Sequence, residues 1–349
     1  MPLLFDSETV ERFSKLLERA QNIVILSHMN PDGDAVGSAL ACRHWLRESF
    51  FAGAPERPIT VVLPHPCLKD TAYLPGADGI VDAVSDPDGA VARIREADLL
   101  WGVDFNTASR IEPLDEALRT SQGVKLLCDH HHHPDTKLFD AVISVADLSS
   151  TCELLYWLFV QMIGDNSVTD NVARCLYHGI NTDTGCFAYS NEEASLYEAT
   201  AALMRHPLEA AKVHNTICNS YSTNKMRLLG FLISQRLVVD ESLGYAYMAI
   251  NRADLEAQGC GPEELEGLVN YTLMMERVQV GVLVKEAEGK VRLSLRSKDD
   301  FDVNRFARKY FGGGGHTKAS GATSPYDFET TVAVLEKQLR KELKKHLSQ

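Results

Sequence analysis

The chain has 349 residues, 45% of them hydrophobic, and its 48 acidic and 35 basic side chains give a formal net charge of −13. A body this acidic disfavours long polyanions, because a protein that follows a nucleic-acid backbone normally presents a basic stripe. The length exceeds what one hydrophobic core usually holds, so two domains are expected.

Eight cysteines are scattered along the chain without a CxxC pair. We interpret them as small buried hydrophobic side chains in a reducing compartment, not as a disulfide framework or a zinc ribbon. The N-terminal residues contain no basic segment followed by an apolar one, and no uncharged run is long enough to cross a bilayer. These features predict a cytoplasmic protein that has no membrane partner.

The first half of the chain alternates between helical and strand-like patterns. A helix is expected over residues 6–20, and further helices are expected at 34–46, 113–118 and 170–180. Short apolar runs predict strands at residues 23–26, 59–63, 98–103 and 124–128. This alternation predicts an α/β domain built on a parallel sheet.

The second half predicts a smaller domain. After a helix at residues 192–204, a weakly periodic segment is interpreted as a linker. Strands are expected at 237–239, 245–250, 278–284 and 290–297, with the last two forming a hairpin, and helices are expected after Pro262, at 302–310 and at 329–346. We therefore expect a first domain over residues 1–204, a linker over 205–236 and a second domain over 237–349.

Four short acidic or histidine-bearing segments occur in the first domain, each after an apolar stretch. They are HMNPDGDA at 28–35, GVDFN at 102–106, CDHHHHP at 128–134 and NTDTG at 181–185. In parallel α/β sheets, ligands bind beyond the carboxyl ends of the strands, where the first three segments are expected to lie. Imidazoles and carboxylates together are typical ligands of a divalent metal that activates water, so hydrolysis is the preferred chemistry.

The first segment has two interpretations when it is taken alone. Pro31 and Gly33 form a tight turn from which His28, Asp32 and Asp34 can point into one small volume. The sequence NPDG is also a common turn whose aspartates are simply solvated.

Of the other three segments, the second favours a ligand role and the remaining two also have simpler interpretations. A charge on Asp104, directly after a strand, is costly unless it is paired, hydrogen-bonded or bound to a metal, which favours a ligand role. Asp129 can orient His130 or His131 while one of them binds metal, but a histidine run can also be a solvated cluster. Asp183 can simply lie in the turn after a helix.

If the four segments did not form one site, four independent turns would have acquired metal-ligand residues in matching positions by accident. Together they therefore indicate a shared site. With RLSLRSK at 292–298 and GGGGHTKASG at 312–321, they resemble the DHH phosphoesterase superfamily and its accompanying DHHA1 domain, in the same order over nearly the whole chain. Within it, the chain is most similar to the stand-alone nanoRNase and pAp phosphatase (NrnA-type) group. The resemblance implies a parallel-sheet domain with helices on both faces and a smaller α/β domain with a mixed sheet.

The resemblance also implies two divalent metal ions. Mn²⁺ is the expected ion because mixed nitrogen and oxygen ligands with open sites suit it, and Zn²⁺ and Co²⁺, which can bind such ligands more tightly, are the alternatives. Carried over residue by residue, it implies one ion held by His28, Asp32 and Asp104 and a second held by Asp34, Asp104, His130 and Asp183. Asp104 would bridge the ions, and His131 would face the scissile phosphate, which makes these two the expected catalytic residues. His132 and His133 are assigned no role.

The second domain is expected to hold the rest of the substrate. The glycines at 312–315 would let the backbone approach a phosphate and form an anion nest, although a glycine run is a flexible loop in most proteins. The Arg296 guanidinium offers a planar fork for a terminal phosphate. The expected substrate contacts are Arg296, Ser297, Gly313, Gly314, Gly315 and His316, joined by Arg110 and Asn106 of the first domain.

The preferred function is a metal-dependent phosphoesterase that cleaves very short oligoribonucleotides or linear dinucleotides to 5′-mononucleotides and also removes the 3′-phosphate of pAp. Long nucleic acid is not an expected partner, and a homodimer is left open. A cyclic dinucleotide (c-di-AMP) phosphodiesterase is the closest alternative. A nucleotide-binding regulator without catalysis is the alternative from another class, although such a protein should have lost at least one of the six expected ligands.

Overall fold

The computed structural model describes residues 5–189, 192–287, 289–298 and 300–348, and the chain divides after Ser220 into two compact units. The segment for which the sequence predicts a linker, residues 205–236, contains helices α8 (Ala210–Cys218) and α9 (Thr223–Phe231) on either side of this division. The domain boundaries themselves remain a prediction.

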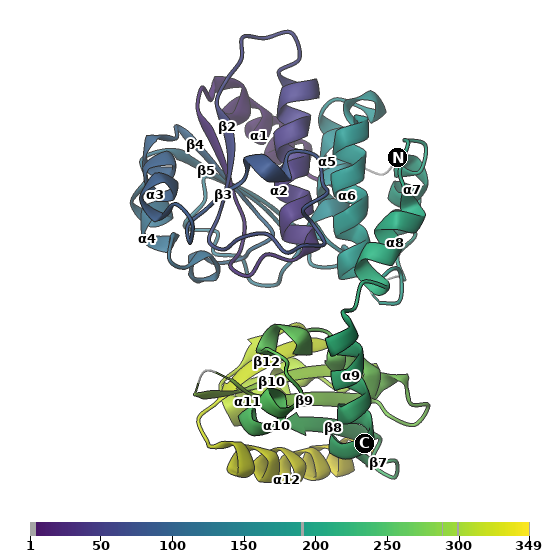
Figure 1. Ribbon diagram of the computed structural model, residues 1–349. Coiled ribbons are helices and arrows are strands. Elements are labelled where there is room, and N and C mark those ends of the chain that lie inside the picture. The colour runs from purple at the N-terminus through teal and green to yellow at the C-terminus, as the bar shows by residue number, and fades with distance from the viewer. Residues whose placement is uncertain (1–4, 190–191, 288, 299, 349) are drawn as a thin grey trace. The chain divides into compact units, whose positions relative to one another are not determined.

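The first unit is built on a parallel sheet (Figure 1). Its strands are β1 (Ile23–Leu26), β2 (Ile59–Leu63), β3 (Val81–Asp82), β4 (Leu99–Val103), β5 (Val124–Asp129) and β6 (Ala141–Ser144). All neighbours pair in parallel in the order β3-β2-β1-β4-β5-β6. The direction of strand addition reverses between β1 and β4, and ligands bind outside the carboxyl ends of the strands at such a point.

Helices cover both faces of this sheet. They are α1 (Ser7–Arg19), α2 (Gly33–Trp45), α3 (Pro87–Glu96), α4 (Asp115–Thr120), α5 (Thr151–Met162), α6 (Asp170–Asp183), α7 (Ala194–Leu203) and α8. Ile25 of β1 belongs to the core with α1, α2, α5 and α6, whereas the adjacent Val24 belongs to the core with α3 and α4. Because successive strand residues point to opposite faces, both faces of the sheet are buried.

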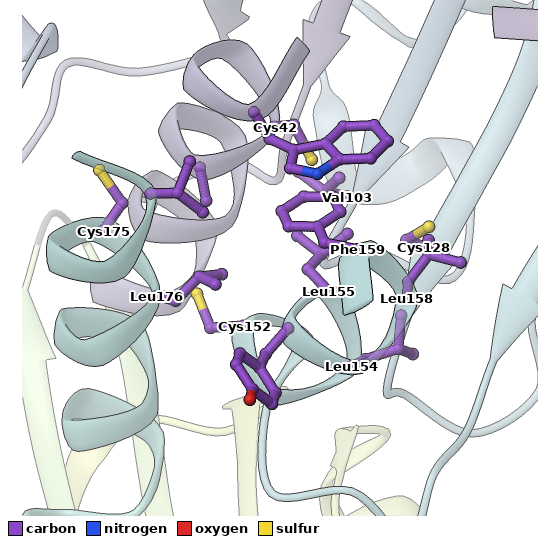
Figure 2. Close-up of a cluster of buried hydrophobic side chains, with 14 of the residues drawn as sticks. Cys42, Val103, Cys128, Cys152, Leu154, Leu155, Leu158, Phe159, Cys175 and Leu176 are labelled. Carbon is purple, nitrogen blue, oxygen red and sulfur yellow. The ribbon is translucent and has the colours of Figure 1, made fainter. Parts of the chain in front are cut away.

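The larger core lies between the sheet and helices α2, α5 and α6, and Figure 2 shows part of it. Trp45 stacks on Phe159 with ring centroids 4.3 Å apart. Four thiols are buried as expected, on Cys42, Cys128, Cys152 and Cys175. The expectation of burial is wrong for Cys218, which is exposed because it ends α8 at the surface.

Helix α2 packs closely on α5 and α6 because glycines stand at the contacts (Figure 1). A Cβ atom at Gly37 would lie 2.7 Å from the carbonyl oxygen of Cys175. One at Gly179 would lie 2.3 Å from Cys152 Sγ and 2.8 Å from Asp34 Oδ1. Since real Cβ contacts are longer than this, any side chain at either position would push the helices apart.

The second unit is a mixed sheet with helices on both faces. Its strands are β7 (Leu237–Asp240), β8 (Tyr245–Ile250), β9 (Val280–Ala287), β10 (Lys290–Ser297), β11 (Gly314–Gly315) and β12 (Ala319–Ser324). They lie in the order β11-β12-β10-β9-β8-β7, and β8 and β9 pair in parallel while the other neighbours are antiparallel. The predicted hairpin is confirmed as β9 and β10. The fold class predicted for the whole chain, an α/β parallel-sheet domain plus a smaller mixed-sheet domain, is therefore confirmed.

Alternate residues of β8 pack on the two faces of this second sheet. Tyr247 belongs to the core with α11 (Val303–Phe311) and α12 (Phe328–His346), and Met248 belongs to the core with α9 and α10 (Arg252–Ala257). The helix expected after Pro262 is instead two short 3₁₀ segments, because Gly267 between them adopts a positive φ of 77°. Among the residues that the structure describes, every helix is too short or too polar to span a bilayer.

The packing of α2 on α6 can be tested with Gly179→Ala. The added methyl group would overlap Cys152 Sγ, so we expect a loss of about 1–3 kcal/mol in the free energy of unfolding of the first unit. All three tryptophans lie in this unit, so the urea midpoint from tryptophan fluorescence reports on it alone.

The matched control is Glu198→Ala in α7 of the same unit, where the side chain that is shortened is exposed to solvent. We expect this control to leave the tryptophan midpoint unchanged. An unchanged midpoint for Gly179→Ala as well would contradict the close helix packing.

Candidate metal centre

The structure brings the predicted ligands of the first unit together at the carboxyl ends of β1, β4 and β5. His28 follows β1, Asp104 directly follows β4 and His130 directly follows β5. These three strands are neighbours in the sheet and run parallel, so their ends meet at one edge. Asp34 in the first turn of α2 and Asp183 at the end of α6 complete the group.

The first cluster contains His28, Asp32 and Asp104. His28 Nε2 lies 3.7 Å from Asp32 Oδ2 and 3.3 Å from Asp104 Oδ2. The Nδ1–H of His28 donates to the carbonyl oxygen of Met29 (2.8 Å), which directs Nε2 at the two carboxylates. Nε2 is buried and has no hydrogen-bond partner among the described residues. A buried nitrogen of this kind is uncommon, and a cation among the three side chains would satisfy it.

The second cluster contains Asp34, His130 and Asp183, whose ligand atoms all lie within 4.8 Å of one another. His130 Nε2 is 3.2 Å from Asp183 Oδ2, and the opposite ring nitrogen, Nδ1, lies 3.3 Å from the carbonyl oxygen of Leu148. A hydrogen bond from Nδ1 to a carbonyl is the usual way in which a metal-binding histidine is oriented. Both histidines of the site are held in this manner.

Asp104 connects the two clusters. Its Oδ2 faces His28, and its Oδ1 lies 3.6 Å from His130 Nε2. Asp104 adopts a positive φ of 61°, which Asp and Asn tolerate better than most other residues with a side chain. Its backbone N–H donates to the carbonyl oxygen of Cys128 (3.0 Å), so the neighbouring strand holds this turn. The two oxygens of one buried carboxylate therefore face two different groups of ligands.

Burial and mutual repulsion shift the ionisation of the site. Burial raises the pKa of Asp34 well above its usual value, and the charges of Asp104 and Asp183 raise it further. Burial likewise raises the pKa of Asp183 to about 6. For His28 and His130 burial lowers the pKa, but the surrounding carboxylates outweigh it and raise both pKa values well above the usual one. The site concentrates negative charge that protons or cations must offset, and metals compete with protons for such ligands.

Two residues that the sequence analysis did not identify hold the carboxylates in place. The backbone N–H groups of Thr151 and Cys152, at the start of α5, donate to Asp34 Oδ2 (2.7 Å) and Oδ1 (2.9 Å). The Thr151 hydroxyl donates to Asp104 Oδ1 (2.9 Å). The sequence signal for this helix start is Ser150 followed three residues later by Glu153, as in a capping box. The Ser150 hydroxyl accepts a hydrogen bond from the N–H of Glu153, and the Glu153 carboxylate accepts one from the N–H of Ser149, one residue before the helix cap.

His131 is oriented by a buried carboxylate. Its Nδ1–H donates to Asp129 Oδ1 (2.7 Å), and Asp129 is fully buried at the end of β5. The same ring nitrogen lies 3.7 Å from Asp104 Oδ1. Of the two histidines that Asp129 was expected to orient, the structure therefore selects His131, beside the bridging position.

Asn106 and Arg110 link the loops around the site. The Asn106 side chain donates through Nδ2 to the carbonyl oxygen of His132 (2.7 Å), which joins the second segment to the third. The carbonyl oxygen of Arg110 accepts a hydrogen bond from the N–H of Met29 (2.7 Å), next to His28. Both residues support the loop geometry, and a contact of either with substrate remains a prediction.

The predicted contacts of the second unit gather at one end of its sheet. Strand register places Arg296 of β10 opposite Ala319 of β12, and Gly315 of β11 opposite Ser320. The N–H of Gly313 donates to the carbonyl oxygen of Ala307 (3.2 Å) and that of His316 donates to the carbonyl oxygen of Ala319 (2.8 Å), so these two amides have acceptors within the unit. An anion nest at residues 312–315 remains a prediction. The buried Ser297 hydroxyl has no hydrogen-bond partner among the described residues.

Two family models match the chain. The model for the DHH family, N-terminal domain, matches residues 22–180, and the model for the DHHA1 domain matches residues 242–345. The first match covers the loops that carry His28, Asp104 and His130. Asp183 lies three residues beyond it, so its place in the site comes from the geometry of α6.

Individual proteins are similar over almost the full length. The bifunctional oligoribonuclease and PAP phosphatase NrnA of Bacillus subtilis (strain 168) is 28% identical, with 90% of this chain and 92% of that protein covered. The protein of the same name from Thermus thermophilus is 26% identical, with 86% and 83% covered. The crystal structure of an exopolyphosphatase-related protein from Bacteroides fragilis matches with a TM-score of 0.92, at 29% identity and 99% coverage of both chains. The chain belongs to the DHH phosphoesterase family and combines a DHH domain with a DHHA1 domain.

Proposed function

We propose that this phosphoesterase uses two divalent metal ions to hydrolyse very short oligoribonucleotides or linear dinucleotides to 5′-mononucleotides, and that it also removes the 3′-phosphate of pAp. The observation that carries the proposal is the position of Asp104, whose two oxygens face His28 and His130. The substrate class is supported by the relatives named for oligoribonuclease and PAP phosphatase activity, which match along almost the whole chain.

The proposed ligands of the two ions are His28, Asp32 and Asp104 for one, and Asp34, Asp104, His130 and Asp183 for the other. The unpartnered, buried His28 Nε2 and the excess of carboxylates both fit a cation. Nitrogen and oxygen donors together suit Mn²⁺, which is the ion we propose. When bound, the ions would lower the pKa of water to supply a nucleophile and would offset charge on the phosphate oxygens.

The remaining groups of the site position these side chains and the substrate. Thr151 and Cys152 fix the direction of the Asp34 carboxylate, and the Thr151 hydroxyl does the same for Asp104. Asp129 holds His131 beside Asp104, and we propose that the opposite ring nitrogen, Nε2, faces the scissile phosphate. An N–H group at this position would stabilise the charge that develops on the phosphate.

A short substrate agrees with the charge of the protein, because a net charge of −13 disfavours the binding of a long polyanion overall. We propose that the second unit binds the part of the substrate beyond the scissile phosphate. Arg296 supplies a guanidinium for a terminal phosphate, and Ser297 supplies a buried hydroxyl that still has a hydrogen bond to give.

Asp104→Asn tests the bridging role. We expect the variant to lose at least about 100-fold in turnover of a dinucleotide, since even residues that only support metal ligands cost 10- to 100-fold when they are changed. Asn also tolerates the positive φ at this position, so the circular dichroism spectrum should be unchanged.

The matched control for this variant is Asp98→Asn, before the opposite end of β4, where the carboxylate accepts hydrogen bonds from the N–H groups of Gln21 and Asn22. It should retain nearly the parental rate. If the folded Asp104→Asn protein were equally active, Asp104 would not bridge the ions.

Substrate comparison tests the proposed activity itself. With Mn²⁺ present, we expect kcat/KM for the linear dinucleotide pApA to exceed that for a long single strand by about tenfold or more, equivalent to ~1.4 kcal/mol of transition-state free energy. Turnover of pAp should also be measurable, and chelation of the metal should stop both reactions. Equal rates on short and long strands would reject the substrate class, and faster hydrolysis of cyclic di-AMP than of pApA would favour the cyclic dinucleotide alternative.

A further inference from the structure

A second group of side chains of the kind that bind metals lies in the first unit, apart from the residues assigned to the centre above. It consists of Cys186, His214 and Cys218, whose ligand atoms all lie within 4.8 Å of one another. The two sulfur atoms are 3.0 Å apart, and both cysteines are free thiols. Cys218 and His214 are exposed and Cys186 is half-exposed, so a cation can reach the group from solvent.

Two adjacent helices build this group. His214 and Cys218 are four residues apart in α8, which places them one turn apart on the same helix face. Cys186 lies in the turn after α6, a helix that packs against α8. This turn is fixed by hydrogen bonds from the N–H of Cys186 to the carbonyl oxygen of Asn181 (2.7 Å) and from the N–H of Phe187 to Thr184 Oγ1 (3.0 Å).

The chemistry of the group differs from that of the carboxylate-rich centre. Two thiols and one imidazole form a soft ligand set, which favours Zn²⁺, and three protein ligands leave a fourth position for water or another group. Tetrahedral zinc with Zn–S bonds of about 2.3 Å would hold two sulfurs roughly 3.8 Å apart. The observed 3.0 Å therefore has to increase slightly, which rotation of exposed side chains permits.

We propose that Cys186, His214 and Cys218 bind Zn²⁺ or a cation of similar softness, and that both cysteines release their thiol protons to solvent on binding. The site would have a structural consequence for the chain. Cys186 follows Asp183 by three residues, and Cys218 precedes by two residues the point at which the first unit ends. A cation here joins the turn beside a proposed ligand of the centre to the end of α8.

Cobalt binding tests the proposal on the full-length, reduced protein. We expect Co²⁺ to produce a thiolate-to-cobalt charge-transfer band whose final intensity corresponds to one thiolate-bound cobalt ion per protein chain. Zn²⁺ should abolish the band by displacing the cobalt. Cys186→Ser and Cys218→Ser should each lose the band, and His214→Ala should weaken cobalt binding by tenfold or more. Circular dichroism on each variant shows that it is folded.

Two controls separate this site from another accessible thiol and from the centre proposed for catalysis. Cys260→Ser removes a partly exposed thiol of the second unit, and Asp104→Asn disables the centre proposed for catalysis; both should keep the charge-transfer band. The result is thus independent of whether the proposed phosphoesterase activity is correct. The proposal would be overturned if the parental protein showed no band, or if Cys186→Ser kept it. It would also be overturned if the reduced protein did not bind Co²⁺ and its Cys186 and Cys218 thiols only formed a disulfide on exposure to air.

Discussion

Repulsion among buried carboxylates is the constraint on which the rest of the first unit depends. Asp34 and Asp104 are almost completely inaccessible to solvent, and Asp183 adds a third carboxylate within reach of the same histidine. Like charges this close cannot all stay ionised unless protons or cations offset them. The same carboxylates hold His28 and His130 toward the protonated form. A cation bound in this place would therefore stabilise the folded unit.

Three features of the fold bring these carboxylates together: the ends of parallel strands, a helix N-terminus and glycines at helix contacts. Parallel strands β1, β4 and β5 carry their loops to one edge of the sheet, next to the point where strand order reverses. The N-terminus of α5 points two backbone N–H groups at Asp34, and a helix N-terminus favours negative charge. Gly37 and Gly179 let α2 approach α5 and α6 closely enough for Asp34 and Asp183 to share His130.

Many elements of the fold and most of the proposed metal ligands could be predicted from the sequence. The features that could not be predicted were missed for physical reasons. The apolar runs at 23–26 and 59–63 predict β1 and β2 to the residue because polar or proline residues bound them. Helix α5 escapes prediction because residues 151–159 are all buried, which leaves no polar face to mark a helical period. The loops with His28, Asp104 and His130 contain recognisable sequence motifs. The hydrogen bond from the N–H of Thr151 to Asp34 joins residues 117 positions apart, and no motif marks Thr151. The proximity of the Cys186 and Cys218 thiols could not be predicted from their separation in the sequence either, because it results from the packing of α8 on α6.

The central claim is that Asp104 lies between two metal ions, and anomalous diffraction from crystals grown with Mn²⁺ tests it most directly. We expect two peaks at the manganese absorption edge, about 3.5–4 Å apart, with the Asp104 carboxylate coordinating both. A single peak at this edge of the sheet, or two peaks that Asp104 does not join, would contradict the claim.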